Sequence, residues 1–516
     1  MLHPAEYAIF GVLLLATLGP GIFFSLRRSG PPTIDEVFLG SRTIKALPLA
    51  LSALASLMSS AGLIAFTAHY YAYGIHMVWS FITVQLCLPV TVHIIIPVLY
   101  RLKITSLFEY LRIRYGKKIS LTACAIYFIL TQSIGAVAIF AAAMAVTTIF
   151  QVSFLWCCLA IGFTGTLYTA LGGLRGVVWT DCVQAVITLI APITIIVKII
   201  YDSATGNFRL RPLGDINPRV YFLDASLDFT KDENLWSCLI GVTAAHMYRS
   251  GLDQMIIQRY MASRTLEDAK STISSIINSQ AVVLYIDVVS QYFVLTDLQA
   301  TRVTKIIALA VGFIMTLYSA VIPYIGSATR LLLMVSSATT GPFVGLFLSA
   351  LMFPCINSKG AGIATLLTTI FQLWHINEKI RLGIQPPRMP VTVDYCPGNM
   401  TTMLQVGNTT LLQKPRTLDD VFVLSRLSSY WSNSISAVLT ILLALVISAL
   451  TGGPKAYKKR LHLTSDVCLR FWRKLKLISA DYENKETSLP DTVYMMKMPL
   501  EYERHEVEKL TAGTIT

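Results

Sequence analysis

Long apolar segments recur along the whole sequence, and they constrain its fold more than any other feature. Each is long enough to cross roughly 30 Å of hydrocarbon as an α-helix, and too long for a strand of a membrane barrel. The predicted spans are 5–25, 45–68, 77–99, 119–149, 152–171, 177–200, 235–255, 303–325, 331–353, 360–376 and 431–451. Of the 516 residues, 54% are apolar and only 14% are charged. We therefore predict an all-α polytopic membrane protein with eleven spans.

Lysine and arginine in the short loops predict the orientation, because basic loops resist translocation. They gather in loops 26–44 and 100–118 and in the C-terminal tail, which we expect to face the cytosol. The long loop 378–430 instead contains two acceptor sequences for N-glycosylation, at Asn399 and Asn408. We therefore predict a multi-pass protein of the plasma membrane, with its N-terminus outside and its C-terminus in the cytosol.

We expect Asn399 and Asn408 to carry glycans, because both lie in a long outer loop among Pro, Gly and Thr residues. Treatment with a glycosidase should increase the mobility of the protein on a gel. An unchanged mobility of protein from a host that glycosylates would contradict the predicted topology.

The net charge of +13 reflects these basic loops and the tail. It favours contact of the protein with anionic head groups of the lipid bilayer, and it is not evidence for nucleic acid binding. Residues 1–453 form the predicted transmembrane domain. Residues 454–516 are polar and of mixed charge, with few candidate core residues, and they form a predicted cytosolic tail that is largely disordered or partly helical at the membrane surface.

Motifs of common enzyme classes are absent from the sequence. It contains no Walker loop, no GxSxG nucleophile elbow and no HExxH zinc motif. The nine cysteines show neither a disulfide framework nor metal-ligand spacing. We therefore predict that the protein is not an enzyme, and that it performs transport driven by an ion gradient.

The segment LALSALASLMSSAGLIAFTAHYYAYG, 49–74, is unusually rich in small residues. Small residues allow close packing of helices. They also suit an unwound segment whose free carbonyl groups coordinate a cation near the middle of the membrane. The residues by themselves leave both interpretations open.

The segment TALGGLRGVVWTDCVQAVI, 169–187, resembles the signature of the sodium/solute symporters, GG-x-x-x-V-x-W-T-D-x-x-Q between two helices. Further similar segments are 35–56, 106–118, 254–265 and 427–453. The resemblance thus extends over nearly all of residues 1–453. Within the family, the chain is most similar to the sodium-coupled monocarboxylate and multivitamin transporters, whose relatives include the iodide carrier.

This resemblance implies a LeuT-type fold with two inverted repeats of five helices and extra flanking helices. The substrate site would lie between the broken first helices of the repeats, here 45–68 and 235–255. It also implies sodium as the coupling ion. Asp181 would lie beside the path by which sodium leaves.

Four residues match the sodium ligands of the family. The backbone carbonyls would come from Ala55 and Met58, and the hydroxyls from Ser271 and Thr272. A few neutral oxygens can hold sodium without trapping it. The alternative role of the hydroxyl pair is a polar contact between helices or a helix cap.

The predicted substrate residues are Arg249, Asp253 and Gln254, within the second broken helix. An arginine inside a membrane span is costly and indicates a functional partner. Its guanidinium could form a bidentate pair with a substrate carboxylate. Alternatively, Arg249 extends toward the membrane surface, or it pairs with Asp253 four residues later on the same helix face.

The chain departs from the family pattern before Ser271. Family members have a seventh helix, an outer loop and half of the eighth helix between the QRY segment and the Ser/Thr cluster, whereas Lys270 precedes Ser271 directly here. The second repeat is therefore predicted to be incomplete. Two functions remain open: sodium-coupled symport of small organic anions or vitamins, such as monocarboxylate, biotin-like, pantothenate-like or iodide-like substrates, and a transport-incompetent relative that acts as a regulatory or assembly partner.

Overall fold

The computed structural model describes residues 4–26, 39–57, 66–205, 217–263, 265–266, 297–325, 328–382, 388–390, 422–452 and 461–476. Within these ranges the chain is helical and contains no strand, apart from one isolated bridge between Ile44 and Ser263. Five described helical segments are long and apolar enough to cross a bilayer: His76–Arg101, Lys117–Phe150, Leu174–Ala204, Gln299–Tyr324 and Ser429–Leu450. The predicted all-α class is confirmed.

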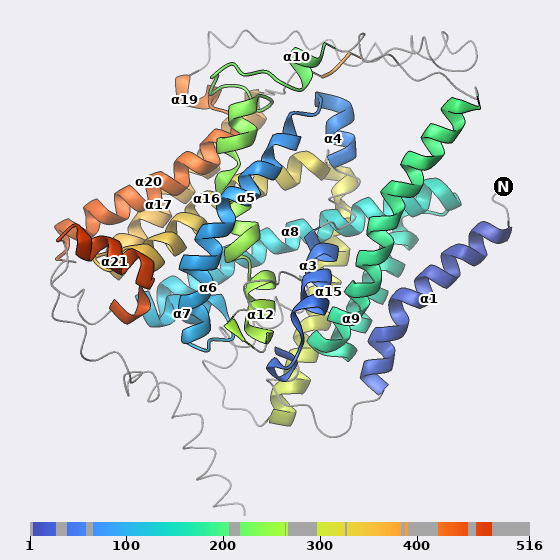
Figure 1. The fold of residues 1–516 in the computed structure, drawn as a ribbon, viewed down its shortest axis with the longest axis horizontal. Coiled ribbons are helices and arrows are strands. Elements are labelled where there is room, and N and C mark those ends of the chain that lie inside the picture. The colour runs from blue at the N-terminus through green and yellow to red at the C-terminus, as the bar shows by residue number, and fades with distance from the viewer. Residues whose placement is uncertain are drawn as a thin grey trace, which may run out of the picture.

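The helices of the first half are α1 (Pro4–Leu26), α3 (Ala46–Leu57), α4 (Phe66–Tyr73), α5 (Ser80–Val90), α6 (Ile96–Arg101), α7 (Leu107–Tyr115), α8 (Lys117–Phe150) and α9 (Phe154–Ala204). Those of the second half are α10 (Pro218–Tyr221), α11 (Thr243–Met247), α12 (Gln254–Ala262), α15 (Asp297–Ile325), α16 (Ala328–Met352), α17 (Ser358–Leu382), α19 (Val423–Arg426), α20 (Ser429–Leu450) and α21 (Asp466–Lys474). Figure 1 shows their arrangement. The π-helical turns η4 (Thr91–Ile95), η6 (Ser237–Gly241) and η7 (Tyr248–Leu252) interrupt two of the longer helical segments.

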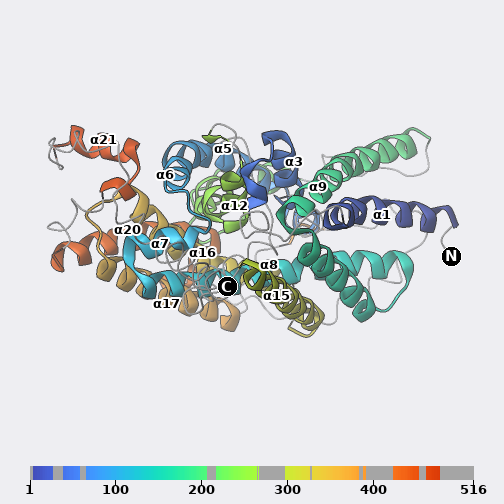
Figure 2. The same ribbon diagram turned by 90° about the horizontal axis from the view of Figure 1, so that it is seen from below.

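Helix α9 differs from the expectation of two separate spans at 152–171 and 177–200. Helical hydrogen bonding continues from Phe154 to Ala204, over 51 residues, because the GGLRG segment between the predicted spans contains no proline to interrupt it. A straight helix of this length would measure roughly 77 Å, more than twice the hydrocarbon thickness. The two halves of α9 run in different directions (Figures 1 and 2).

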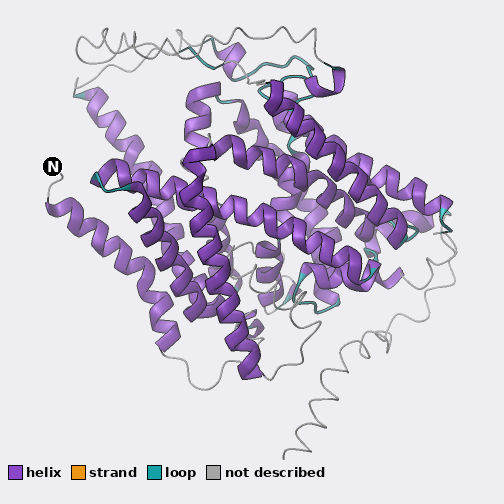
Figure 3. Ribbon diagram, turned by 180° about the vertical axis from the view of Figure 1, so that it is seen from behind, coloured by secondary structure: helices purple, strands orange, loops and turns teal. Residues whose placement is uncertain are grey.

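Small residues bring helices α9 and α15 close together. A side chain added at Gly162 would collide with Thr316, and one added at Gly312 would collide with Thr166. This reciprocal pattern is the close packing that small residues permit between membrane helices. Helices α16, α17 and α20 form a second group of helices that pack on one another, as Figure 3 shows from behind.

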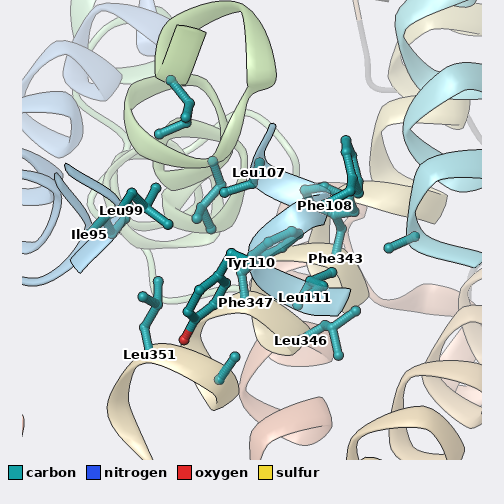
Figure 4. Packing of buried hydrophobic residues seen from close by; sticks show 14 of the residues in the cluster. Ile95, Leu99, Leu107, Phe108, Tyr110, Leu111, Phe343, Leu346, Phe347 and Leu351 are labelled. Carbon is teal, nitrogen blue, oxygen red and sulfur yellow. The ribbon is translucent and has the colours of Figure 1, made fainter. Parts of the chain in front are cut away.

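The main apolar core lies where α6, α7 and α16 meet. Figure 4 shows Leu107, Phe108 and Leu111 of α7 facing Phe343 and Phe347 of α16. These side chains are almost completely buried. Burial of an aromatic or leucine side chain contributes about 1.5–3 kcal/mol, so this cluster holds α7, which is too short to cross a bilayer, firmly against the longer helices.

The second predicted broken helix is indeed discontinuous. It consists of η6, α11 and η7, and then stops at Asp253, whose backbone is extended (φ −83°, ψ 127°). Helix α12 begins at the next residue, and the Asp253 carboxylate accepts a hydrogen bond from the backbone N–H of Met255. Asp253 therefore acts as the N-cap of α12. The first predicted broken helix consists of α3 and α4, and residues 58–65 between them lie outside the described ranges.

Candidate functional site

An ion pair lies at the break of the second broken helix. Arg249 Nη1 donates to Asp253 Oδ2 at 2.9 Å. Tyr127 of α8 donates its hydroxyl to Asp253 Oδ1 at 3.0 Å. The Asp253 side chain is fully buried, whereas 26% of the Arg249 side chain is exposed. Arg249 thus pairs with Asp253, as one of the alternatives from the sequence proposed. The arginine side chain nevertheless stays partly accessible.

The partly exposed Arg249 side chain retains capacity for a second anion. Within the described part of the chain, the hydrogen bonds of Arg249 both use Nη1, to Asp253 and, at 3.7 Å, to the Met255 sulfur. A guanidinium carries further N–H donors in a planar array that matches a carboxylate. The geometry is therefore compatible with a carboxylate that binds Arg249 while Asp253 stays in place.

Gln254 also lies at this break, but its amide group is bonded to backbone. Its Oε1 accepts the N–H of Leu107 at 2.7 Å, and its Nε2 donates to the carbonyl of Thr105 at 3.0 Å. The side chain is completely buried. Gln254 therefore ties the start of α12 to the chain just before α7, and its predicted contact with substrate stays a prediction.

Close packing fixes the position of η7, which carries Arg249. A Cβ atom at Gly251 would lie 2.7 Å from Thr91 Oγ1 and 2.8 Å from Ile95 Cδ1, so only glycine allows this approach to η4. The hydroxyls of Thr91 and Ser250 lie 3.4 Å apart. The two π-helical turns therefore meet directly beside the ion pair.

A second charged cluster joins α3, α9 and α12. Arg259 Nη2 donates to Asp181 Oδ2 at 2.7 Å, and Arg259 Nε donates to Ser52 Oγ at 2.9 Å. The hydroxyl of Ser52 in turn donates to Asp181 Oδ2 at 2.7 Å. Arg259 and Ser52 are fully buried, and Asp181 is 5% exposed. Because a single buried charge would be very costly, these groups depend on one another.

Sequence reasoning identified Asp181 but missed Arg259 and Ser52. Arg259 belongs to the QRY segment, which is one of the segments similar to the symporters. Its charge inside a segment that continues a membrane span was a signal for a buried partner. The sequence did not predict that this partner is Asp181, because the two residues are 78 positions apart.

Of the four predicted sodium ligands, the structure describes only Ala55. Ala55 lies on α3, one helical turn after Ser52, and is buried. The hydrogen bond from Ser52 therefore brings Asp181 close to the helix that carries Ala55. Met58, Ser271 and Thr272 lie outside the described residues. Among the described residues, no group of three or more His, Cys, Asp and Glu residues could hold a metal ion; a sodium site made of carbonyl and hydroxyl oxygens would need none.

Discontinuous helices in a polytopic all-α fold, with charged side chains at the break, define a secondary transporter with LeuT-type architecture. The Sodium:solute symporter family matches residues 37–296, about half of the chain. The chain belongs to this family. Family membership indicates sodium as the coupling ion, and it confirms that the protein is a multi-pass membrane transporter and not an enzyme.

Curated relatives from several animals support the same class. The chain is 23% identical to the sodium-dependent multivitamin transporter of Oryctolagus cuniculus, over 89% of this chain and 88% of the relative. It is 25% identical to sodium-coupled monocarboxylate transporter 2 of Bos taurus, over 91% of this chain and 88% of the relative. It is 29% identical to the human sodium/iodide cotransporter, over 51% of this chain and 41% of the relative.

A solved structure shows the same fold. It is that of a Na+-coupled sialic acid symporter, which superposes with a TM-score of 0.64 at 17% identity and covers 86% of this chain and 97% of the other. The alignment with the rabbit multivitamin transporter extends over 563 positions, more than the 516 residues of this chain. The relative therefore contains residues that have no counterpart here, as expected for a chain that is shorter than the family pattern.

Proposed function

We propose that the protein couples sodium entry to the uptake of small organic anions, such as monocarboxylates or carboxylate-bearing vitamins, across the plasma membrane. The observation that carries this proposal is the partly exposed Arg249 at the break of the second broken helix. The break lies where LeuT-type transporters bind their substrates. The curated relatives named for monocarboxylate and multivitamin transport support the same substrate class.

The ion pair explains how an arginine can serve as an anion site inside a membrane. Asp253 compensates the charge of Arg249 when no substrate is bound, which reduces the cost of an isolated cation. Tyr127 and the N–H of Met255 both donate to the Asp253 carboxylate and hold it in position. A substrate carboxylate would then bind the exposed side of Arg249 and leave one net negative charge at the site. Entry of a sodium ion would compensate that charge.

Sodium would bind between α3 and the segment that contains Ser271 and Thr272, with carbonyl oxygens from Ala55 and Met58. The hydrogen bond from Ser52 of α3 to the Asp181 carboxylate supports a role for Asp181 beside the sodium path. We further propose that the N-terminus lies outside and that the C-terminus lies in the cytosol, in agreement with the distribution of Lys and Arg in the loops.

Uptake into proteoliposomes tests this function. The purified chain, and a version in which the segment before Ser271 is restored from a relative, would be offered lactate, nicotinate, biotin, iodide and uncharged glucose. We expect sodium-dependent accumulation of at least one carboxylate by the restored version and none of glucose. For the unrestored chain we expect weak or absent coupling, because its second repeat is predicted to be incomplete. A restored protein that accumulates none of the anions when sodium is present would refute the proposed function.

A further inference from the structure

Residues 461–476 of the tail pack against three other helices, α6, α7 and α16. The carbonyl of Leu463 accepts the hydroxyl of Tyr110 from α7 at 2.9 Å. The N–H of Ser465 donates to the carbonyl of Leu351, at the end of α16, at 2.9 Å. The indole of Trp472 donates to the carbonyl of Met352 at 2.8 Å. This part of the tail is therefore packed against the helical bundle.

Arg101, the last residue of α6, attaches the same segment through its guanidinium. It donates to both carboxylate oxygens of Asp466, at 3.0 and 3.1 Å, and to the carbonyl of His462 at 2.8 Å. Burial, together with the nearby Arg101 and Arg114, lowers the pKa of His462, so its ring stays neutral at physiological pH. Asp466, the only acidic residue of the segment, is thus compensated by Arg101.

Helix α21 has two different faces. Cys468 and Leu469 are buried against the protein. The other side of the helix exposes Val467 and Phe471, and Leu475 directly after the helix is exposed as well, with 39%, 56% and 51% of each residue accessible. The basic residues Arg470 and Lys474 are exposed on the same side of the helix, and Lys476 is exposed just beyond its end. Figures 1 and 2 both place α21 at one edge of the molecule.

We infer that the exposed face of α21, together with Leu475 directly after it, is a lipid-binding surface, which inserts Val467, Phe471 and Leu475 at the bilayer interface and binds anionic head groups through Arg470 and Lys474. Helices that lie in the membrane interface combine these two kinds of residue on one side. Each basic residue near an anionic membrane surface strengthens binding about fivefold. The charge of the face is complementary to that of anionic lipid, because Arg101 compensates Asp466, the acidic residue of the described segment 461–476.

Because of its position, α21 can connect lipid binding to the helical bundle of the transporter. The segment is bonded to α6 through Arg101, to α7 through Tyr110 and to α16 through Leu351. Lipid bound to α21 would therefore stabilise the contact between three helices of the bundle.

Hydrogen exchange on the full-length protein in nanodiscs tests the lipid-binding surface. One set of nanodiscs would contain phosphatidylcholine alone, and the other equal parts of phosphatidylcholine and phosphatidylserine. We expect backbone amides of 466–476 to exchange at least about fivefold more slowly in the anionic nanodiscs. High salt should reduce this difference, because it screens exposed charges.

Two variants sharpen the result. Arg470→Glu combined with Lys474→Glu should abolish the difference between the two lipids, whereas Arg219→Glu, an exposed residue on α10, should preserve it. Equal exchange of the wild-type segment in both lipids would overturn the inference, whatever the variants do. Protection that appears only after addition of a soluble acidic protein would also overturn it, because the surface would then serve a protein partner.

Discussion

Uptake of carboxylate substrates is expected to fall about a hundredfold when Arg249 is replaced by alanine. A charge-assisted hydrogen bond to a carboxylate contributes about 2–3 kcal/mol, which corresponds to this factor in apparent affinity. Arg249 is the residue of the break that is both charged and partly accessible, whereas Asp253 and Gln254 are fully buried. The loss should therefore appear as a higher substrate concentration for half-maximal uptake, measured by initial rates at saturating sodium in a transport-competent version.

Two further variants separate recognition of the anion from structural damage. Arg249→Ala leaves the buried Asp253 without its cation, which by itself can destabilise the protein. The double variant Arg249→Ala with Asp253→Asn removes both charges, and it should fold better while uptake of anions stays low. Arg249→Lys keeps the charge but not the planar donor array, and it should retain part of the affinity. Unchanged anion affinity in a well-folded Arg249→Ala protein would reject this substrate site.

Replacing Arg259 by alanine is expected to destabilise the protein by about 3–5 kcal/mol, because removal of one partner leaves the other charge buried and unpaired. Arg259 is completely buried and joins α12 to Asp181 on α9 and to Ser52 on α3. The melting temperature of the purified protein in detergent should fall clearly. The double variant Arg259→Met with Asp181→Leu should recover much of the loss, since an apolar replacement of both partners leaves no uncompensated charge.

An exposed ion pair provides the matched control for this experiment. Lys198 and Asp202 lie 2.6 Å apart on α9, four residues from each other, and 67% of the lysine side chain is exposed. Such pairs contribute less than about 0.5 kcal/mol. Lys198→Ala should therefore leave the melting temperature nearly unchanged. Equal shifts for Lys198→Ala and Arg259→Ala would contradict the structural role that we assign to the buried cluster.

The sequence by itself determined the class of the protein and the positions of most helices. Apolar runs report membrane helices directly, because a helix in hydrocarbon satisfies its own backbone and needs only apolar side chains. The predicted spans 119–149 and 431–451 accordingly match α8 and α20 closely. The signature at 169–187 is a local pattern, and it was sufficient to indicate the symporter family that the comparisons then showed. Hydropathy did not predict that α9 is continuous, because a bent helix and two separate helices give the same pattern of apolar residues.

Only the tertiary structure decided which charged groups are partners. The spacing of Arg249 and Asp253 permitted an ion pair on one helix face but equally permitted an arginine that faces only substrate. Burial of Asp253 at the break and its hydrogen bond from Tyr127, 126 residues away, favour the pair. The tail likewise has few candidate core residues in its sequence, yet contacts with α6, α7 and α16 hold residues 461–476 in place. Such contacts join residues that are distant in sequence, and their energy depends on burial and geometry that exist only after the helices have packed.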